Sequence, residues 1–161
     1  MGNTEAAATR ELRLTAAEAE LVGEEVATVG RLHPDPAAQA RYAELAEIVA
    51  GGVVAEDRLE QLTTILEIGL QSGRIRRVYG ADGEMALGRI YSRTPRGSEV
   101  TQAAAAVTDA LRAVHGQVID NLRITALGPG AYSLLVDTRE CQITIRLDRS
   151  GVRVDNVALG I

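Results

Sequence analysis

The chain has 161 residues and a formal net charge of −5, with 46% hydrophobic and 24% charged side chains. This balance is typical of a folded globular protein, because disordered chains combine low hydrophobicity with high net charge. All 17 basic residues are arginine. The absence of lysine excludes Schiff-base chemistry and the lysine of a phosphate-binding P-loop.

The apolar residues are small, since the chain contains no Phe or Trp and only four Tyr. A core of Leu, Ile, Val and Ala buries less area per residue than one with aromatic rings. We expect a subunit interface to supply part of the missing burial, and therefore predict a homo-oligomer, most simply a dimer.

Cys141 is the single cysteine, so an intrachain disulfide and a cysteine-rich metal site are both excluded. It lies in a strand-like run, where a buried and inert thiol is expected. No stretch of eighteen apolar residues occurs, and the first fifteen residues lack an apolar segment. These features favour a cytoplasmic protein that does not enter a membrane.

The first predicted helix begins at a capping box, Thr15 to Glu18, and runs to about Arg31. Its spacing places most of the carboxylates opposite the apolar face, which favours a solvated surface over an acid–base pair. The carboxylates in question are Glu18, Glu20, Glu24 and Glu25.

A second helix is predicted to begin with Asp35 as its cap and Pro36 at its first position, and to stop at Gly51. A third helix is predicted from about Ala55 to Gln71.

The segment after Gly73 is ambiguous. Residues 74–79 fit either a short strand or a further helical turn, and Asp82 fits the cap of a short helix that follows. The run from Thr94 to Gly97 is predicted to be a turn, because Pro and Gly are common in turns. Ser98 is then expected to cap the last helix.

From about residue 122 the apolar period changes from 3.6 residues to 2, which indicates β-strands. Four alternating runs follow, joined by turn signals such as Asp148 to Gly151. The sequence therefore predicts an α+β fold with about five N-terminal helices followed by a four-stranded antiparallel β-meander. The meander is expected to pack on the last helix, with Leu111 and Ile145 in the same core. Residues 1–97 form the helical region and residues 98–161 the helix plus sheet, and we expect the two to make one compact domain.

Charge is unevenly distributed along the chain. Residues 1–72 carry thirteen acidic side chains and five arginines, whereas residues 73–100 carry six arginines and three acidic side chains. Guanidinium groups match the oxygens of phosphate, and tyrosine rings can stack on a base. The segment 74–96 is therefore the candidate anion- or partner-binding site, with candidate residues Arg74, Arg76, Arg77, Arg89, Arg93, Arg96, Tyr79 and Tyr91. Pairing of these arginines with the neighbouring acidic helices is the favoured alternative for any single arginine.

No catalytic or cofactor motif is evident. His33 and His115 lie far apart in the sequence, at the ends of predicted helices, and do not form a metal-ligand pattern. The run Gly128-Pro129-Gly130 precedes no helix, so it is predicted to be a turn and not a phosphate loop. We accordingly predict no catalytic residue, no metal and no cofactor.

The leading hypothesis is a non-catalytic protein that acts through homo-oligomer assembly or by binding a protein partner. The alternative is a module that binds an anionic ligand or nucleic acid through Arg74–Arg96. Nucleic acid is the less favoured partner because the chain is acidic. A metal-independent enzyme without a recognisable motif is the third hypothesis.

Overall fold

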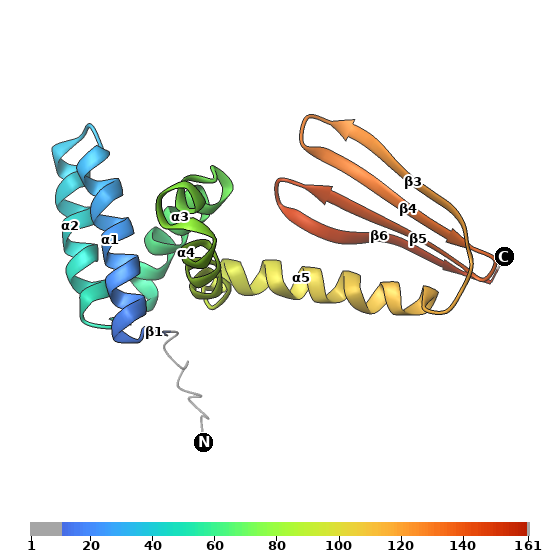
Figure 1. The fold of residues 1–161 in the computed structure, drawn as a ribbon, viewed down its shortest axis with the longest axis horizontal. Coiled ribbons are helices and arrows are strands. Elements are labelled where there is room, and N and C mark those ends of the chain that lie inside the picture. Colours follow the sequence, from blue (N-terminus) through green and yellow to red (C-terminus); the bar gives the residue numbers. More distant parts are fainter. Residues whose placement is uncertain (1–10, 161) are drawn as a thin grey trace, which may run out of the picture. The chain divides into compact units, whose positions relative to one another are not determined.

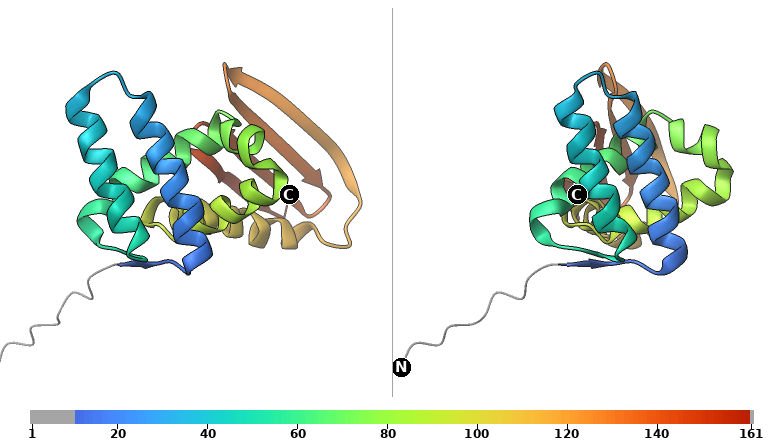
Figure 2. Two further views of the ribbon diagram at one scale, coloured as in Figure 1. Left: turned by 60° about the vertical axis from the view of Figure 1, so that its left-hand side comes forward. Right: turned by 90° about the vertical axis from the view of Figure 1, so that its left-hand side faces the viewer.

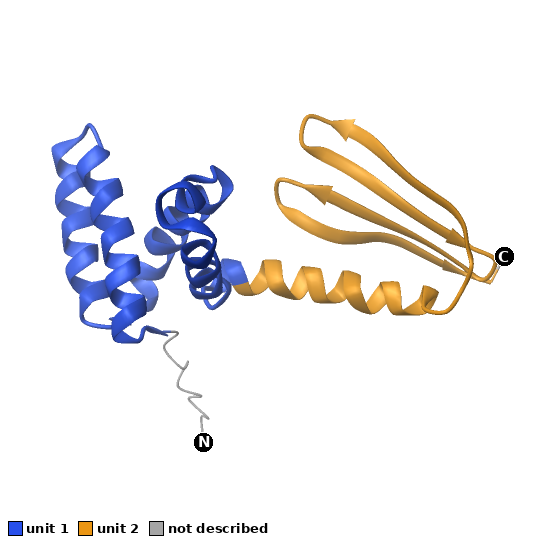
Figure 3. Cartoon of the chain, viewed as in Figure 1, with its two compact units in different colours: residues 1–97 blue, residues 98–161 orange. Residues whose placement is uncertain are grey.

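The computed structural model describes residues 11–160. The chain divides into two compact units, Met1–Gly97 and Ser98–Ile161 (Figure 3). Five α-helices precede a four-stranded antiparallel sheet, which confirms the predicted α+β fold (Figure 1). The helices are α1 (Ala16–Leu32), α2 (Pro36–Ala50), α3 (Glu56–Gln71), α4 (Arg74–Ser92) and α5 (Pro95–Leu111). The sheet strands are β3 (Ile119–Gly128), β4 (Ala131–Thr138), β5 (Cys141–Asp148) and β6 (Gly151–Leu159). No helix within residues 11–160 is long and apolar enough to cross a membrane.

The first two helices begin at the caps that the sequence predicts. The backbone N–H of Glu18 donates to the Thr15 hydroxyl at 3.3 Å, and the backbone N–H of Thr15 donates to the Glu18 carboxylate at 2.9 Å. The Asp35 carboxylate accepts hydrogen bonds from the backbone of Ala37 and Ala38. Each cap satisfies backbone donors that have no partner inside the helix, so these boundaries could be predicted from local sequence.

A short antiparallel ladder joins the start of the described chain to the loop after α2. Strand β1 (Leu12–Arg13) pairs with strand β2 (Val53–Val54), with Leu12 opposite Val54. Neither strand could be predicted from the sequence, because two residues are too few to show an alternating pattern.

Helix α4 resolves the ambiguity of residues 74–79, which are helical. Gly80 interrupts the helix with φ 72° and ψ −171°, a conformation that is readily available only to glycine. The helical segment therefore has two parts that meet at Gly80.

Helix α5 begins earlier than predicted. The Thr94 hydroxyl accepts a 3.2 Å hydrogen bond from the backbone N–H of Gly97, and Pro95 is the first helical residue. The predicted turn over residues 94–97 and the predicted cap at Ser98 are therefore wrong. The reason is that a proline in the first turn of a helix leaves no backbone hydrogen bond unmade.

The core of the Met1–Gly97 unit is built from aliphatic side chains of all four of its helices. Helices α1 and α2 lie side by side in both views of Figure 2. The fully buried side chains include Val22 and Val26 from α1, Leu45 from α2, Leu62 from α3 and Leu87 from α4. Tyr42, Tyr79 and Tyr91 pack against this core from its margin.

The Ser98–Ile161 unit has the strand order β3-β4-β5-β6, with every neighbouring pair antiparallel. Helix α5 runs along one face of the sheet (Figure 1). Its side chains Val107 and Leu111 share a core with Val136, Ile143 and Ile145, which confirms that Leu111 and Ile145 belong to the same core. Cys141 is buried in the same core, as predicted.

Candidate functional site

Arg74 of the predicted site forms a buried ion pair. Its guanidinium contacts the carboxylate of Glu25 in α1, and the Glu25 side chain is completely buried. Gly69 of α3 leaves the space for this carboxylate, because a Cβ at position 69 would lie 3.0 Å from Glu25 Oε1. A buried carboxylate requires a compensating cation. Arg74 therefore has a structural role, because its ion pair with Glu25 holds α4 against α1.

Three further arginines of the segment also pair with carboxylates of the same unit. Arg93 Nη2 lies 2.7 Å from Glu18 Oε1, and Arg93 Nη1 donates to the carbonyl oxygen of Arg13 at 3.2 Å. Each of these contacts ties the end of α4 to the N-terminal side of α1.

The other two pairs join residues of α3, α4 and α5. Arg96 Nε lies 3.2 Å from Glu67 Oε2, which ties the start of α5 to α3. Arg76 Nη1 lies 3.1 Å from Glu84 Oε2, so this pair spans the interruption at Gly80. Both arginines are exposed, and exposed ion pairs add little stability.

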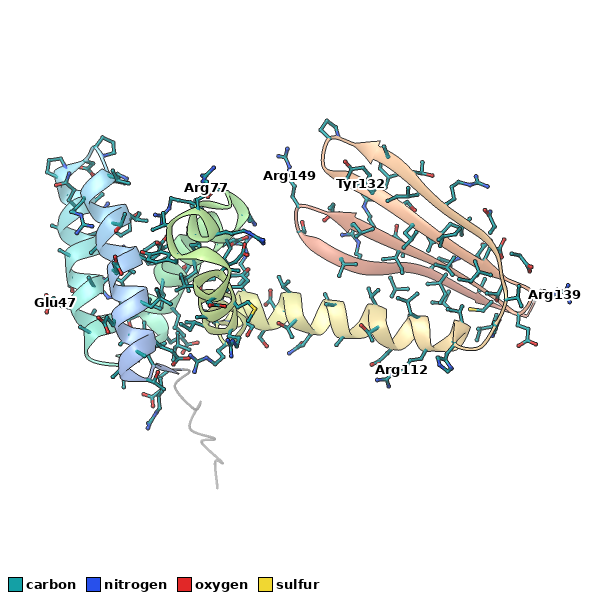
Figure 4. All side chains as sticks on the ribbon, viewed as in Figure 1. Glu47, Arg77, Arg112, Tyr132, Arg139 and Arg149 are labelled. Carbon is teal, nitrogen blue, oxygen red and sulfur yellow. The ribbon has the colours of Figure 1, made fainter. Side chains whose placement is uncertain are left out.

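Arg77 and Arg89 are the arginines of the segment for which no carboxylate lies within 4 Å among residues 11–160. Arg77 is exposed and points away from the helix (Figure 4). The Arg89 Nε donates a long 3.4 Å hydrogen bond to the carbonyl of Met85 one turn earlier. These two guanidinium groups are available to an anionic partner.

The two tyrosines of the predicted site are half-buried against the core of the Met1–Gly97 unit. Burial raises the pKa of Tyr79, and the negative charge of Glu24 raises it further. A ring that packs on a core presents little of its face to a nucleic-acid base.

A cavity of about 390 Å³ lies beside Arg74 in the Met1–Gly97 unit. Its wall combines apolar side chains such as Val29 and Ile65 with the carboxylates of Asp57 and Glu60. The two carboxylates in the lining repel an anion, and Arg74 is already paired with Glu25. The cavity therefore does not complete an anion site around Arg74.

Arginines on the polar face of the sheet form their own ion pairs. Arg146 Nε and Arg153 Nη1 lie 3.2 and 3.1 Å from Asp148 Oδ2. A hydrogen bond from the backbone of Ser150 and the charge of Arg153 lower the pKa of Asp148. Because Asp148 pairs with both arginines, Arg146 and Arg153 can occupy adjacent positions on neighbouring strands despite their equal charges.

Strand β3 exposes apolar side chains that belong to the core-facing side of the sheet. Leu122 is opposite Val136, and Ile124 is opposite Leu134. Val136 is buried beneath α5, but Leu122 and Ile124 are 62% and 67% exposed. Four strands span about 14 Å between the outer backbones, whereas a helix with its side chains is roughly 10–12 Å wide. One helix therefore cannot cover all four strands.

Strand β3 is also an edge of the sheet, because β4 is the only described strand that pairs with it. Its backbone groups on the other side have no neighbouring strand within the described sheet. We call Leu122, Ile124 and this free backbone edge the β3 surface. The β3 surface could not be predicted from the sequence, because alternation shows which side chains share a face and not how far a covering helix reaches.

Histidine and cysteine side chains do not gather into a reactive centre. The His33 ring accepts a 3.2 Å hydrogen bond from the backbone N–H of Asp35, and it lies 5.7 Å from the Tyr42 ring. Between residues 11 and 160, no group of three or more His, Cys, Asp or Glu side chains is placed to hold a metal ion.

The sequence matches no family model, and no curated protein or solved structure is significantly similar to it.

Proposed function

We propose that the protein is non-catalytic and works by assembly, with itself or with a protein partner, through the β3 surface. The observation that supports this proposal is the exposure of Leu122 and Ile124 on the face of the sheet that carries the core. Large aliphatic side chains gain roughly 1.5–3 kcal/mol each when they are fully buried. A surface that leaves two adjacent ones in water is suited to a protein contact.

The small core of the sheet unit supports the same proposal. Its buried apolar residues are Val107, Val136, Cys141, Ile143 and Ile145, all of which are small or aliphatic. A unit of this size that lacks aromatic residues in its core has little stability to spare. A contact at the β3 surface would enlarge this core. The cytoplasmic location and the absence of a cofactor belong to the proposal as well.

Site-specific photo-cross-linking tests the proposal in cells that produce the full chain. A benzophenone amino acid at position 124 should form a covalent protein adduct on irradiation, because the β3 surface is covered in the assembly. The matched control is position 156 on β6, where Asn156 is exposed on the other edge strand. An adduct at 124 and not at 156 is the expected result. No adduct at 124 would contradict the proposal.

A second candidate function is the binding of an anionic ligand, which the availability of Arg77 and Arg89 favours. Replacing both with alanine should abolish binding of a fluorescent oligonucleotide or polyphosphate at low salt, since phosphate contacts depend on charge. The matched control replaces Arg31 and Arg41, two exposed arginines of the same unit, and changes the net charge equally. Equal loss of binding in both variants, or no binding by the parent, would contradict this candidate.

A further inference from the structure

The two edge strands of the sheet differ in how they are protected against pairing with another strand. Edge strand β6 carries Arg153, Asp155 and Asn156, and Asp155 is an extra residue between the positions that pair with Thr144 and Ile145. Charged side chains and bulges of this kind prevent edge-to-edge association. The edge of β6 is therefore protected.

The edge of β3 lacks this protection along its centre. Residues 121–126 pair one-to-one with residues 137–132 of β4, and the register shifts only at the two ends, next to Asn121 and Gly128. The central segment contains one charged side chain, Arg123, between Leu122 and Ile124. A regular, exposed edge strand with apolar side chains on one face is a template for a further strand.

We propose that β3 pairs antiparallel with β3 of a second copy, which joins two four-stranded sheets into one continuous sheet. This inference rests on the proposed function and names the partner and the contact. A two-fold axis perpendicular to the sheet relates the copies, so the core-facing sides of both sheets lie on the same side. Leu122 and Ile124 of the two copies then form one apolar cluster at the axis.

The charge of the sheet unit is compatible with a second copy as the occupant of this edge. The Ser98–Ile161 unit carries seven acidic side chains and six arginines, so two such units meet with little net repulsion. The apolar side chains of the β3 surface are uncharged, which allows the surface to contact itself. Self-complementarity is the requirement for a two-fold interface.

The charge of Arg123 and the faces on which the side chains lie also select the register of this pairing. In a pairing centred on Ile124, Ile124 opposes itself, Leu122 opposes Ala126, and Arg123 opposes Thr125. A pairing centred on Arg123 would place two guanidinium groups opposite each other, which is unfavourable between directly paired residues. A shift of a single residue in only one copy would place apolar side chains on the polar face.

Cysteine cross-linking of the full chain tests the pairing and its register. In the Ile124-centred register the Cα atoms of the two Ile124 residues lie about 5 Å apart, within the range of a disulfide. Those of the two Thr125 residues lie about 8 Å apart, which is too far. Mild oxidation should therefore convert most of the Ile124→Cys variant to a covalent dimer of the 17.1 kDa chain. Ile124 is exposed, so the substitution is compatible with folding.

Four controls accompany this variant. Thr125→Cys, Val157→Cys on β6 and the parent chain with its buried Cys141 should remain largely monomeric on a non-reducing gel. Arg123→Cys should also link poorly, and a link at 123 in place of 124 would overturn the register. Equal linking at 124, 125 and 157 would indicate random collision and overturn the pairing itself.

Two further outcomes separate this inference from the proposed function. If the photo-cross-linker at position 124 captures only another protein, assembly through the β3 surface stands and self-pairing is overturned. If light scattering shows a 17.1 kDa monomer for the parent up to about 100 μM, self-pairing is likewise overturned. A dimer that the Ile124→Glu variant converts to a folded monomer is the expected result.

Discussion

Arg74, the first residue of α4, forms an ion pair with Glu25, the side chain of which is completely buried in α1. One Arg74 nitrogen atom is buried but the Arg74 side chain is 24% exposed, so the pair lies at the boundary between the core and the solvent. The contact connects the most basic segment of the chain to α1, which carries four glutamates. This arginine therefore has a structural role that can be separated experimentally from the roles of its neighbours.

Replacing Arg74 with alanine should lower the free energy of unfolding by roughly 3–5 kcal/mol, because it leaves a buried carboxylate without a cation. Urea denaturation of the full chain measures this change. Arg77→Ala, at an exposed position on the same helix, is the matched control and should change stability by less than about 0.5 kcal/mol. The double change Glu25→Leu/Arg74→Met should recover most of the loss. Equal losses of unfolding free energy in Arg74→Ala and Arg77→Ala would contradict the structural role of Arg74.

Ile145→Ala should cost about 2–5 kcal/mol of unfolding free energy, since Ile145 is 2% exposed in the core between α5 and the sheet. Leu159→Ala is the comparison, because Leu159 is 72% exposed at the end of β6. A loss below about 0.5 kcal/mol at Ile145 would place this side chain outside the core.

Thr94→Ala should destabilise the protein by about 1 kcal/mol, within the usual range for the loss of an N-terminal helix cap. The expected cause is the loss of the hydrogen bond from the Gly97 backbone to the Thr94 hydroxyl. Ser98→Ala should have a smaller effect because Ser98 lies inside α5. Thermal unfolding followed by circular dichroism compares the two, and a larger effect at Ser98 would restore the boundary predicted from sequence.

The charge of Glu18 should make stability depend on pH in the acidic range. The backbone hydrogen bond from Thr15 lowers the pKa of Glu18, and Arg93 lowers it further, although partial burial opposes both. A pKa that is lower in the folded state contributes stability above the unfolded value, near 4.5, and this contribution disappears as pH falls through the folded value. The difference in melting temperature between the parent and Glu18→Gln should therefore be larger at pH 7 than at pH 3.

The exposed Glu20, two residues further along α1, offers the control for this measurement. Glu20→Gln should change the melting temperature little at either pH. If the melting temperatures of the parent and Glu18→Gln differ by the same amount at pH 7 and pH 3, the capping carboxylate has no electrostatic role.

Local signals account for the parts of the fold that could be predicted. Asp35 followed by Pro36 marks the start of α2, and Thr94 followed by Pro95 marks the start of α5 in the same way. From the sequence alone the second signal also fits a turn, because Pro95 and Gly97 are both common in turns. A proline preceded by a capping residue is compatible with both structures, and only the contacts of the following residues decide between them.

The features that could not be predicted depend on packing between residues that are far apart in the sequence. The spacing of the carboxylates predicts a solvated surface for Glu25, yet Glu25 is buried and lies four residues from both Leu21 and Val29 on the apolar stripe of α1. Its partner Arg74 is distant in sequence, so the pair depends on the packing of α4 against α1. The β3 surface depends similarly on the width of the sheet relative to α5, which no local pattern contains.

Cys141 provides an internal reporter for one half of the molecule. Its thiol is 3% exposed at the start of β5, where the hydroxyl of Thr138 accepts a 3.0 Å hydrogen bond from its backbone N–H. A thiol-specific reagent can reach it only when the sheet separates from α5 or the chain unfolds. Because the Met1–Gly97 unit contains no cysteine, the labelling rate measures the opening of the sheet unit alone. The native sequence thus permits the local stability of this unit to be followed without an introduced probe.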